Sequence, residues 1–191
     1  VGEPGSMAAR PAVRCLNVGK LDYVRAQSLQ RLLVRARRME IAPDTLLLVE
    51  HPPVFTLGRV QASHTNLKVS KEDIAAAGAS IVQSDRGGNV TFHGPGQLVA
   101  YPILDLGGYK RDLRWYVSAL ERALIATASS FGLQARAGGD GETGVWVQDA
   151  KIAALGISVQ RWVTSHGLAL NADVDLRFFE LIVPCGLHER P

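Results

Sequence analysis

The sequence predicts an α+β domain built on a mostly antiparallel or mixed β-sheet. Short runs of strand composition occur in clusters, and only two long stretches, 23–39 and 112–131, carry apolar residues at helical spacing. This arrangement differs from a regular alternation of strands and helices, which would indicate a parallel sheet. With 191 residues, of which 47% are hydrophobic and 20% charged, the chain can bury one sizeable core.

In the first half, Val13 to Val18 has strand composition and precedes a helix from about Tyr23 to Met39. The helix is predicted from apolar residues at roughly helical spacing, namely Val24, Leu29, Leu32 and Leu33. Two successive prolines after His51 separate two further strands, because proline supplies no N–H donor to a β-ladder. A short helix is expected to begin after Ser70 and to end at Gly78. The remaining strands of this half are predicted at 45–50, 54–57, 81–83 and 89–92.

In the second half, the clearest element is an amphipathic helix over 112–131, closed by Gly132. Its apolar stripe consists of Leu113, Val117, Leu120, Leu124 and Ala128. Short strands are predicted at 145–147, 151–154, 157–159 and 168–170. We interpret residues 1–12 as a leader or an expression-vector remnant, and 13–191 as a single domain.

Charge and cysteine content exclude several classes of protein. The excess of Lys and Arg over Asp and Glu is only +3, and the basic residues are scattered except in Arg31–Arg38. We interpret that run as the solvated face of a helix, with a docking surface as the alternative. A nucleic-acid partner is not expected from one Arg-Gly-Gly triplet, and no apolar stretch is long enough to cross a membrane. Cys15 and Cys185 alone form no disulfide scaffold, and we expect neither a metal nor a cofactor.

The segment from Arg86 to Gln97 is the first candidate for a functional site. It contains four glycines, one proline, an arginine and a histidine within twelve residues. Glycines let backbone N–H groups approach a ligand, and Arg86 could hold an anion or a carbonyl oxygen. A purely structural double turn is the alternative interpretation.

Cys185 is the second candidate, because Pro184 and Gly186 would fix a tight turn and expose its sulfur. In isolation, a buried structural thiol is the commoner role for such a residue. A nucleophilic thiol needs a base or a cation, and Lys151, His93 and His166 are the candidates. Cys15 lacks comparable turn residues and is the weaker candidate.

Four motifs in order along the chain resemble those of the lipoyl(octanoyl) transferase family. They are Glu50-His-Pro-Pro-Val-Phe-Thr-Leu-Gly58, Arg86-Gly-Gly-Asn-Val-Thr-Phe-His-Gly-Pro-Gly-Gln97, Lys151-Ile-Ala-Ala-Leu-Gly156 with Ser165-His-Gly-Leu-Ala-Leu-Asn171, and Ile182-Val-Pro-Cys-Gly-Leu187. The resemblance covers about 13–187. It implies a fold like that of biotin and lipoate protein ligases, an α+β domain with a curved mixed sheet and flanking helices.

The resemblance also implies an activity and its residues. An octanoyl group would pass from octanoyl-acyl carrier protein to a lysine of a lipoate-dependent protein, such as a 2-oxoacid dehydrogenase subunit or the glycine cleavage H protein, without ATP. Cys185 would carry the acyl group as a thioester and Lys151 would tune its pKa. The implied acyl-binding residues are Arg86, Gly87, Gly88, Asn89, Val90, Thr91, Phe92, His93, Ala154, Leu155, Gly156, Gly167, Leu168 and Ala169.

Several further expectations accompany this interpretation. The chain ends six residues after Cys185, where the family usually continues, so we expect it to be truncated at its C-terminus. We expect the protein to be a monomer. We expect it in the mitochondrial matrix, because the N-terminal stretch is rich in arginine, with a bacterial cytoplasm or a plastid as alternatives. The alternative functions are an ATP-dependent lipoate or biotin ligase, a Cys-His hydrolase and a basic RNA-binding module.

Overall fold

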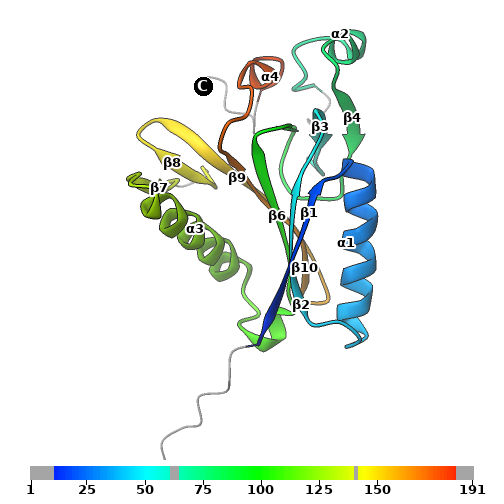
Figure 1. Ribbon diagram of the computed structural model, residues 1–191, viewed down its shortest axis with the longest axis vertical. Coiled ribbons are helices and arrows are strands. Elements are labelled where there is room, and N and C mark those ends of the chain that lie inside the picture. Colours follow the sequence, from blue (N-terminus) through cyan, green and yellow to red (C-terminus); the bar gives the residue numbers. More distant parts are fainter. Residues whose placement is uncertain (1–10, 61–64, 140–141, 184–191) are drawn as a thin grey trace, which may run out of the picture.

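The computed structural model describes residues 11–60, 65–139 and 142–183, and it confirms the α+β class. Figure 1 shows the elements, which form a seven-stranded sheet of order β1-β2-β6-β10-β9-β8-β7 and a three-stranded sheet of order β4-β3-β5. The elements are β1 (Val13–Lys20), α1 (Tyr23–Arg38), β2 (Asp44–Glu50), β3 (Val54–Leu57), α2 (Lys71–Ala76), β4 (Ser80–Gln83), β5 (Thr91–His93), β6 (Gln97–Ile103), a 3-10 helix (Leu106–Gly108), α3 (Leu113–Ser130), β7 (Ala135–Ala137), β8 (Val145–Val147), β9 (Ala150–Gln160), β10 (Val163–Asn171) and α4 (Arg177–Glu180).

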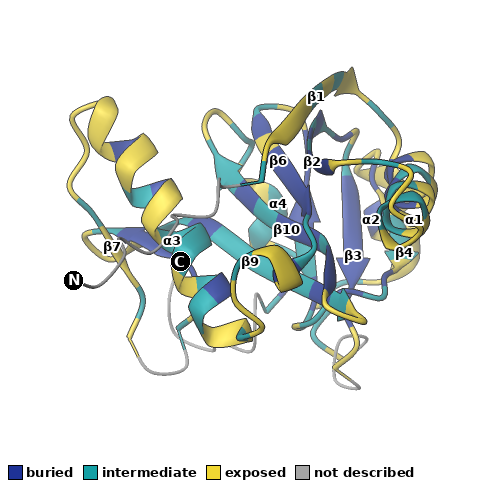
Figure 2. Ribbon diagram, turned by 90° about the horizontal axis from the view of Figure 1, so that it is seen from below, coloured by how far each residue is buried: buried dark blue, intermediate teal, exposed yellow. Residues whose placement is uncertain are grey.

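Both sheets are mixed, as predicted. In the larger sheet β1 runs parallel to β2 through the crossover helix α1, and the other neighbouring strands are antiparallel. In the smaller sheet β3 is parallel to β4 and antiparallel to β5. Figure 2 shows that β1 is largely exposed whereas β3 is buried throughout, because β1 is an edge strand and β3 is central in its sheet.

The predicted set of elements needs two corrections. The sequence analysis missed β6, a central strand that contains Pro102, as well as β7, α4 and the 3-10 helix. The two strands predicted at 151–154 and 157–159 are one continuous strand, β9, because Gly156 pairs with Gly167 of β10 without interrupting the ladder. Gly156 interrupts the apolar pattern by which a strand is predicted, but the backbone at Gly156 stays extended.

Helix α1 begins where expected, and its predicted apolar residues are only partly confirmed as core: Leu29 and Leu33 pack against it, whereas Val24 and Leu32 do not. The Asp22 side chain caps it by accepting from the backbone N–H groups of Val24 and Arg25. Val24 and Leu32 are 50% and 65% exposed, and the buried residues are Tyr23, Ala26, Gln27 and Gln30. Two glutamines are therefore placed against the sheet, where apolar residues were expected.

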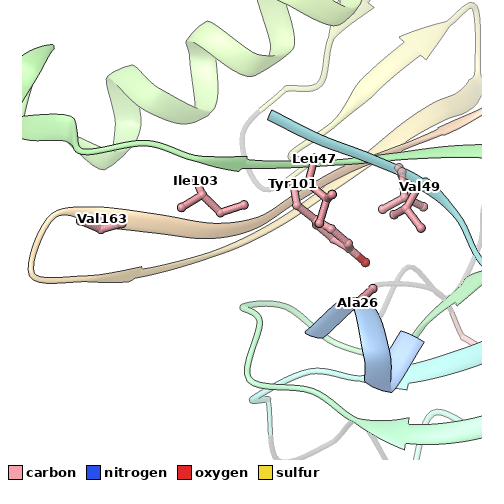
Figure 3. Close-up of a cluster of buried hydrophobic side chains, with 8 residues drawn as sticks. Ala26, Leu47, Val49, Tyr101, Ile103 and Val163 are labelled. Atoms are coloured by element: carbon pink, nitrogen blue, oxygen red, sulfur yellow. The ribbon is translucent and has the colours of Figure 1, made fainter. Parts of the chain in front are cut away.

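The long helices lie on opposite faces of the larger sheet (Figure 1). On the α1 side, Ala26 packs on a core that includes Leu47, Val49 and Tyr101 (Figure 3). On the α3 side, Leu124 packs with Val145 and Ala153. A third cluster around Phe55 and Phe92 joins the smaller sheet to α2 and α4. The cores thus fix both helices relative to β9 and β10, the strands that carry several candidate residues.

Helix α3 follows the prediction closely. Asp112 caps its first turn through a 3.0 Å bond from the backbone N–H of Trp115, and Leu124 and Ala128 are buried. Leu113, at the first turn, is 44% exposed and lies outside the buried stripe. Across the described ranges, none of the helices combines the length and the apolar character that a membrane span requires.

Candidate functional site

The segment after Arg86 meets β9 and β10 beside the N-terminus of α1, and the residues enclose a cavity. We call it the inner cavity, and its volume is about 40 Å³. Its lining residues are Tyr23, Arg86, Gly88, Asn89, Thr91, His93, Val99, Tyr101, Ala154, Leu155, Gly156, His166, Gly167, Leu168 and Ala169. Segments up to 146 residues apart in sequence therefore form one site.

The structure brings together most of the acyl-binding residues that the family resemblance implied, but three of them do not line the cavity. Asn89, Thr91 and His93 line the inner cavity, whereas Val90 and Phe92 alternate with them and belong to the core shared with α4. This alternation is the two-residue period of extended chain. The Phe92 ring stacks on Phe178 with centroids 4.4 Å apart. Gly87 contributes packing instead, since its N–H donates to the Ile157 carbonyl of β9 at 2.9 Å.

Two glycines let the strands and the loop approach closely at the cavity. Gly156 and Gly167 are paired across β9 and β10. A Cβ atom at Gly167 would lie 2.3 Å from the Ala100 carbonyl oxygen of β6, a distance that real Cβ atoms do not adopt. A Cβ at Gly156 would lie 3.1 Å from the Gly87 carbonyl oxygen and 3.2 Å from Arg86 Cδ. Backbone packing therefore requires Gly167, and the loop leaves only narrow space at Gly156.

Arg86 is a structural arginine as well as a lining residue. Its side chain donates to the Thr56 carbonyl oxygen at 2.7 Å, to Thr56 Oγ1 at 2.9 and 3.1 Å, and to the Gly87 carbonyl oxygen at 2.9 Å. Only 7% of the residue is exposed. The sequence analysis proposed that Arg86 holds an anion or a carbonyl oxygen. The carbonyl oxygens that it holds here belong to its own chain, and they lock the glycine-rich loop onto β3.

The histidines at the cavity are neutral near pH 7. Burial is the main cause that lowers the pKa of His93 to about 3, and burial also lowers the pKa of His51. His93 Nδ1 donates to Gln97 Oε1 at 2.7 Å, and the His93 ring stacks on Tyr23 with centroids 5.9 Å apart. His51 donates through Nδ1 to the Leu21 carbonyl and accepts from the Tyr101 hydroxyl. The inner cavity is thus surrounded by fixed, uncharged rings.

His166 stands out because its backbone is strained inside a strand. Its φ is 55°, in the left-handed region, and it is only 3% exposed. Its Nε2 lies 2.9 Å from Asp85 Oδ1, and its backbone N–H donates to Gln30 Oε1 at 2.7 Å. Burial lowers the pKa of His166 more strongly than the Asp85 hydrogen bond raises it. The pair is therefore a neutral imidazole that donates to a carboxylate.

Asp85 is the half-exposed partner in this pair. Burial is the largest single influence on the pKa of Asp85, and it acts to raise that pKa. The hydrogen bond from His166, together with smaller contributions, outweighs it and brings the pKa of Asp85 below its ordinary value. Gln27 Nε2 also donates to Asp85 Oδ1 at 2.9 Å. Helix α1 therefore positions both His166 and Asp85 through its two buried glutamines.

Lys151 and Cys185, the two residues with implied chemical roles, are not among the residues that line the inner cavity in the described part of the chain. Lys151, at the start of β9, is partly buried, does not line the inner cavity, and places its Nζ 5.6 Å from the centre of the Trp146 ring. Its side chain crosses Gly144, where a Cβ atom would lie 2.5 Å from Lys151 Cε. Cys185 lies outside the described residues. Cys15, the weaker candidate, is a free and exposed thiol on β1.

Three lining residues were missed by the sequence analysis, namely Tyr23, Val99 and Tyr101. Tyr23 lies in the first turn of α1, and Val99 and Tyr101 lie in β6, which the sequence analysis missed, so no local signal distinguishes them. Within the ranges that the structure describes, no group of three or more His, Cys, Asp or Glu residues is arranged to hold a metal ion.

Comparison with known proteins places this geometry in a family. Residues 22–190 match the family described as lipoyl protein ligase A/B catalytic domain. Similar curated proteins include a mitochondrial octanoyltransferase of Arabidopsis thaliana, 45% identical over 91% of this chain and 73% of the relative, and an octanoyltransferase of Solibacter usitatus, 49% identical over 91% and 78%. A mitochondrial octanoyl-acyl-carrier-protein:protein N-octanoyltransferase of Danio rerio is 44% identical over 93% and 79%.

Solved structures with a similar fold are lipoate ligases of low sequence identity. A lipoate-protein ligase A bound with ATP superposes with a TM-score of 0.70 at 14% identity, over 91% of this chain and 71% of the other. A bipartite lipoate protein ligase of Thermoplasma acidophilum gives 0.70 at 18% identity, over 88% and 65%. These likenesses confirm the predicted ligase-like fold.

Proposed function

Since the chain belongs to the lipoyl protein ligase A/B catalytic-domain family and is an acyltransferase of the octanoyltransferase type, we propose that it moves an octanoyl group through a Cys185 thioester. The donor is octanoyl-acyl carrier protein. The acceptor is a lysine of a lipoate-dependent protein, either a lipoyl domain of a 2-oxoacid dehydrogenase or the glycine cleavage H protein. This transfer is the first step of endogenous protein lipoylation.

The observation that carries this proposal is the character of the inner cavity. Aliphatic side chains and backbone from β6, β9 and β10 form much of its wall, including Val99, Leu155 and Leu168. The neighbouring histidines are neutral, and the guanidinium of Arg86 is engaged by oxygens of its own chain. A largely apolar lining of this kind suits an aliphatic acyl chain, because Arg86, its charged residue, already donates hydrogen bonds to oxygens of its own chain.

The small volume of the inner cavity limits how an octanoyl chain can bind there. About 40 Å³ holds only a few water molecules, so an eight-carbon chain must move lining side chains apart. The wall contains Gly88, Gly156 and Gly167, which add no side-chain bulk. Acyl binding should therefore be coupled to a small displacement of the glycine-rich loop from β9, where Gly87 N–H donates to the Ile157 carbonyl.

The proposed reaction needs only one nucleophile and one base. The Cys185 thiolate attacks the donor thioester carbonyl, a new carbon–sulfur bond forms, and the carrier thiol leaves with a proton. The acceptor lysine amine then attacks the enzyme thioester, an amide forms, and the Cys185 thiol is released. Lys151 takes the proton from the thiol in the first step and from the amine in the second. Lys151 Nζ lies 5.6 Å from the centre of the Trp146 ring, and this contact holds the side chain at the start of β9.

An ATP-dependent ligase is the main alternative, and its fold does not distinguish it from a transferase. The 44–49% identity to octanoyltransferases over about nine-tenths of the chain favours the transferase. A thioester is already activated, so transfer needs no phosphoanhydride.

The test is a mass measurement of an apo lipoyl domain incubated with the enzyme and one of two acyl sources. Octanoyl-carrier protein without ATP or Mg²⁺ should add an octanoyl group to the lysine. Octanoate with ATP and Mg²⁺ should give none. Modification only in the second mixture would overturn the proposal and favour the ligase.

For compartment and assembly, we propose a monomer in the mitochondrial matrix. The mitochondrial octanoyltransferases among the relatives support that compartment, and the bacterial ones keep a bacterial cytoplasm as the alternative. Sedimentation at micromolar concentration tests the monomer, and a dimer would contradict it.

A further inference from the structure

A second, larger cavity lies next to the inner cavity, between α1, the end of β9 and the start of β10. We call it the arginine groove, because Arg31, Arg35, Arg38 and Arg59 are among the residues that line it. Its volume is about 400 Å³, about ten times that of the inner cavity. The proposed acyl transfer leaves this space unused.

Strand β9 sets the order of the reacting end, the acyl site and the groove. Lys151, the proposed base, lies at the start of the strand. Ala154 to Gly156 line the inner cavity, and Ser158 to Gln160 line the groove. At about 3.3 Å per residue, these three positions follow one another along a single extended strand. An acyl chain whose carbonyl carbon lies near Lys151 therefore points its methyl end toward the groove.

His166 lies at the boundary between the two cavities. Among the residues that the structure describes, it is the only one that lines both. It pairs with Ile157, the residue of β9 that lies between the last one at the inner cavity and the first one at the groove. The Ile157 carbonyl also accepts the N–H of Gly87 at 2.9 Å, so the glycine-rich loop is attached at the same point. One side chain and one loop contact therefore lie between the acyl site and the groove.

The His166 ring is held in this position by its neighbours. Its Nε2 lies 2.9 Å from Asp85 Oδ1, and its backbone N–H donates to Gln30 Oε1 at 2.7 Å. The Tyr101 ring meets it edge-on, with centroids 6.0 Å apart. The residue is buried, and its φ of 55° is one that residues other than glycine rarely adopt. Backbone strain of this kind persists where the surrounding structure enforces it, and it is concentrated at functional sites.

We propose that His166 forms the end wall of the acyl site and thereby sets the preference for an eight-carbon chain. This inference rests on the proposed function and assigns a specificity-determining residue to it. A longer chain would have to push the buried ring aside and break its hydrogen bond to Asp85. A chain that ends before the ring meets no such cost. The large volume of the groove is thus kept out of reach of the acyl chain by a single side chain.

The test compares octanoyl-carrier protein with dodecanoyl-carrier protein as donors, with an apo lipoyl domain as the acceptor. For each enzyme, the quantity measured is the kcat/KM for dodecanoyl transfer divided by the kcat/KM for octanoyl transfer. In the wild type we expect dodecanoyl transfer to be at least about tenfold less efficient, because extra methylene groups forced into a packed site displace its walls.

Two variants of His166 shorten the wall without opposing its backbone conformation. His166→Gly removes the ring and accepts the positive φ, so it should raise the ratio about tenfold by opening the site toward the groove. His166→Asn keeps a shorter side chain that tolerates the left-handed region, and it should raise the ratio by a smaller factor. The matched control Val99→Ala enlarges the inner cavity at a position that does not line the groove, and it should raise the ratio by less than about twofold.

The other outcomes would contradict the proposal in different ways. An unchanged ratio in both His166 variants would overturn the end wall and leave the proposed function intact. An equal rise in Val99→Ala would overturn it too, because the total volume of the cavity would then set the chain length. Equal efficiency for both donors in the wild type would show that no wall limits the chain, and this comparison needs no variant to fold. No transfer from either thioester by the wild type would overturn the proposed function, and this inference with it.

Discussion

The inner cavity lies beside a second cavity on β9 and β10, the arginine groove, which is lined by Arg31, Arg35, Arg38 and Arg59. The inner cavity is narrow and has one arginine in its wall, whereas the groove has about ten times its volume and contains four. The difference begins at Gly156, which faces the glycine-rich loop, while Ser158 and Gln160 contact arginines. Two residues along one strand thus separate a largely apolar cavity from a cavity lined by arginines.

The largest expected effect concerns how tightly the strands pack at each site. Gly167→Ala should lower the free energy of unfolding by about 3 kcal/mol or more, because its Cβ would lie 2.3 Å from the backbone oxygen of Ala100. Ser165→Ala, on the same strand at the groove, should change it by less than about 0.5 kcal/mol. Urea unfolding monitored by fluorescence measures both, and equal losses would show that the two positions on β10 are packed alike.

The next expected effect is a pH dependence of stability that arises from His93 at the inner cavity. The pKa of His93 is about 3 in the folded protein and about 6.5 when unfolded, so between these values the unfolded state binds more protons and stability falls as the pH falls. The contribution of His93 between pH 7 and pH 5 is about 2 kcal/mol. Unfolding curves at the two pH values should show a smaller fall in His93→Gln than in wild type. An unchanged fall would mean that His93 is protonated in the folded protein.

A change inside the inner cavity should alter the acyl-length preference rather than the fold. The Cβ of Gly156→Ala meets the Gly87 oxygen at 3.1 Å, a contact that a small movement can relieve. We expect kcat/KM for octanoyl transfer to fall about tenfold, and that for butyryl transfer to fall less. Steady-state assays with both acyl-carrier substrates measure the ratio. An equal fall for both chains would place the acyl group elsewhere.

Local signals predicted most of the elements, and their limits explain what was missed. Ser70 acts as a cap where expected, and Asp112, the first residue of the predicted helix range, caps α3, because capping depends on neighbouring residues. The central strand β6 was missed, because its sequence contains Pro102 and its place in the sheet depends on β2 and β10, which are distant in sequence. The buried face of α1 was predicted only in part: Leu29 and Leu33 pack on the core, but Gln27 and Gln30 are also buried, where they bond to Asp85 and His166.

The candidate site, like the fold, could be predicted only where local motifs mark it. The glycine-rich segment and the two glycine-containing strands were found because they carry recognisable motifs, and they lie around one cavity. Tyr23 and Tyr101 could not be found, because nothing local sets them apart from core residues. The arginine groove was visible only as a basic run, since its concavity depends on how α1 packs against β10.

The central claim is that Cys185 carries the octanoyl group, and intact mass spectrometry tests it most directly. The full chain is incubated with octanoyl-carrier protein and no acceptor, alongside Cys185→Ser and the matched control Cys15→Ser. The account predicts one octanoyl adduct that hydroxylamine removes, present in wild type and in Cys15→Ser and absent from Cys185→Ser. An adduct that persists in Cys185→Ser, or that disappears only in Cys15→Ser, would contradict it.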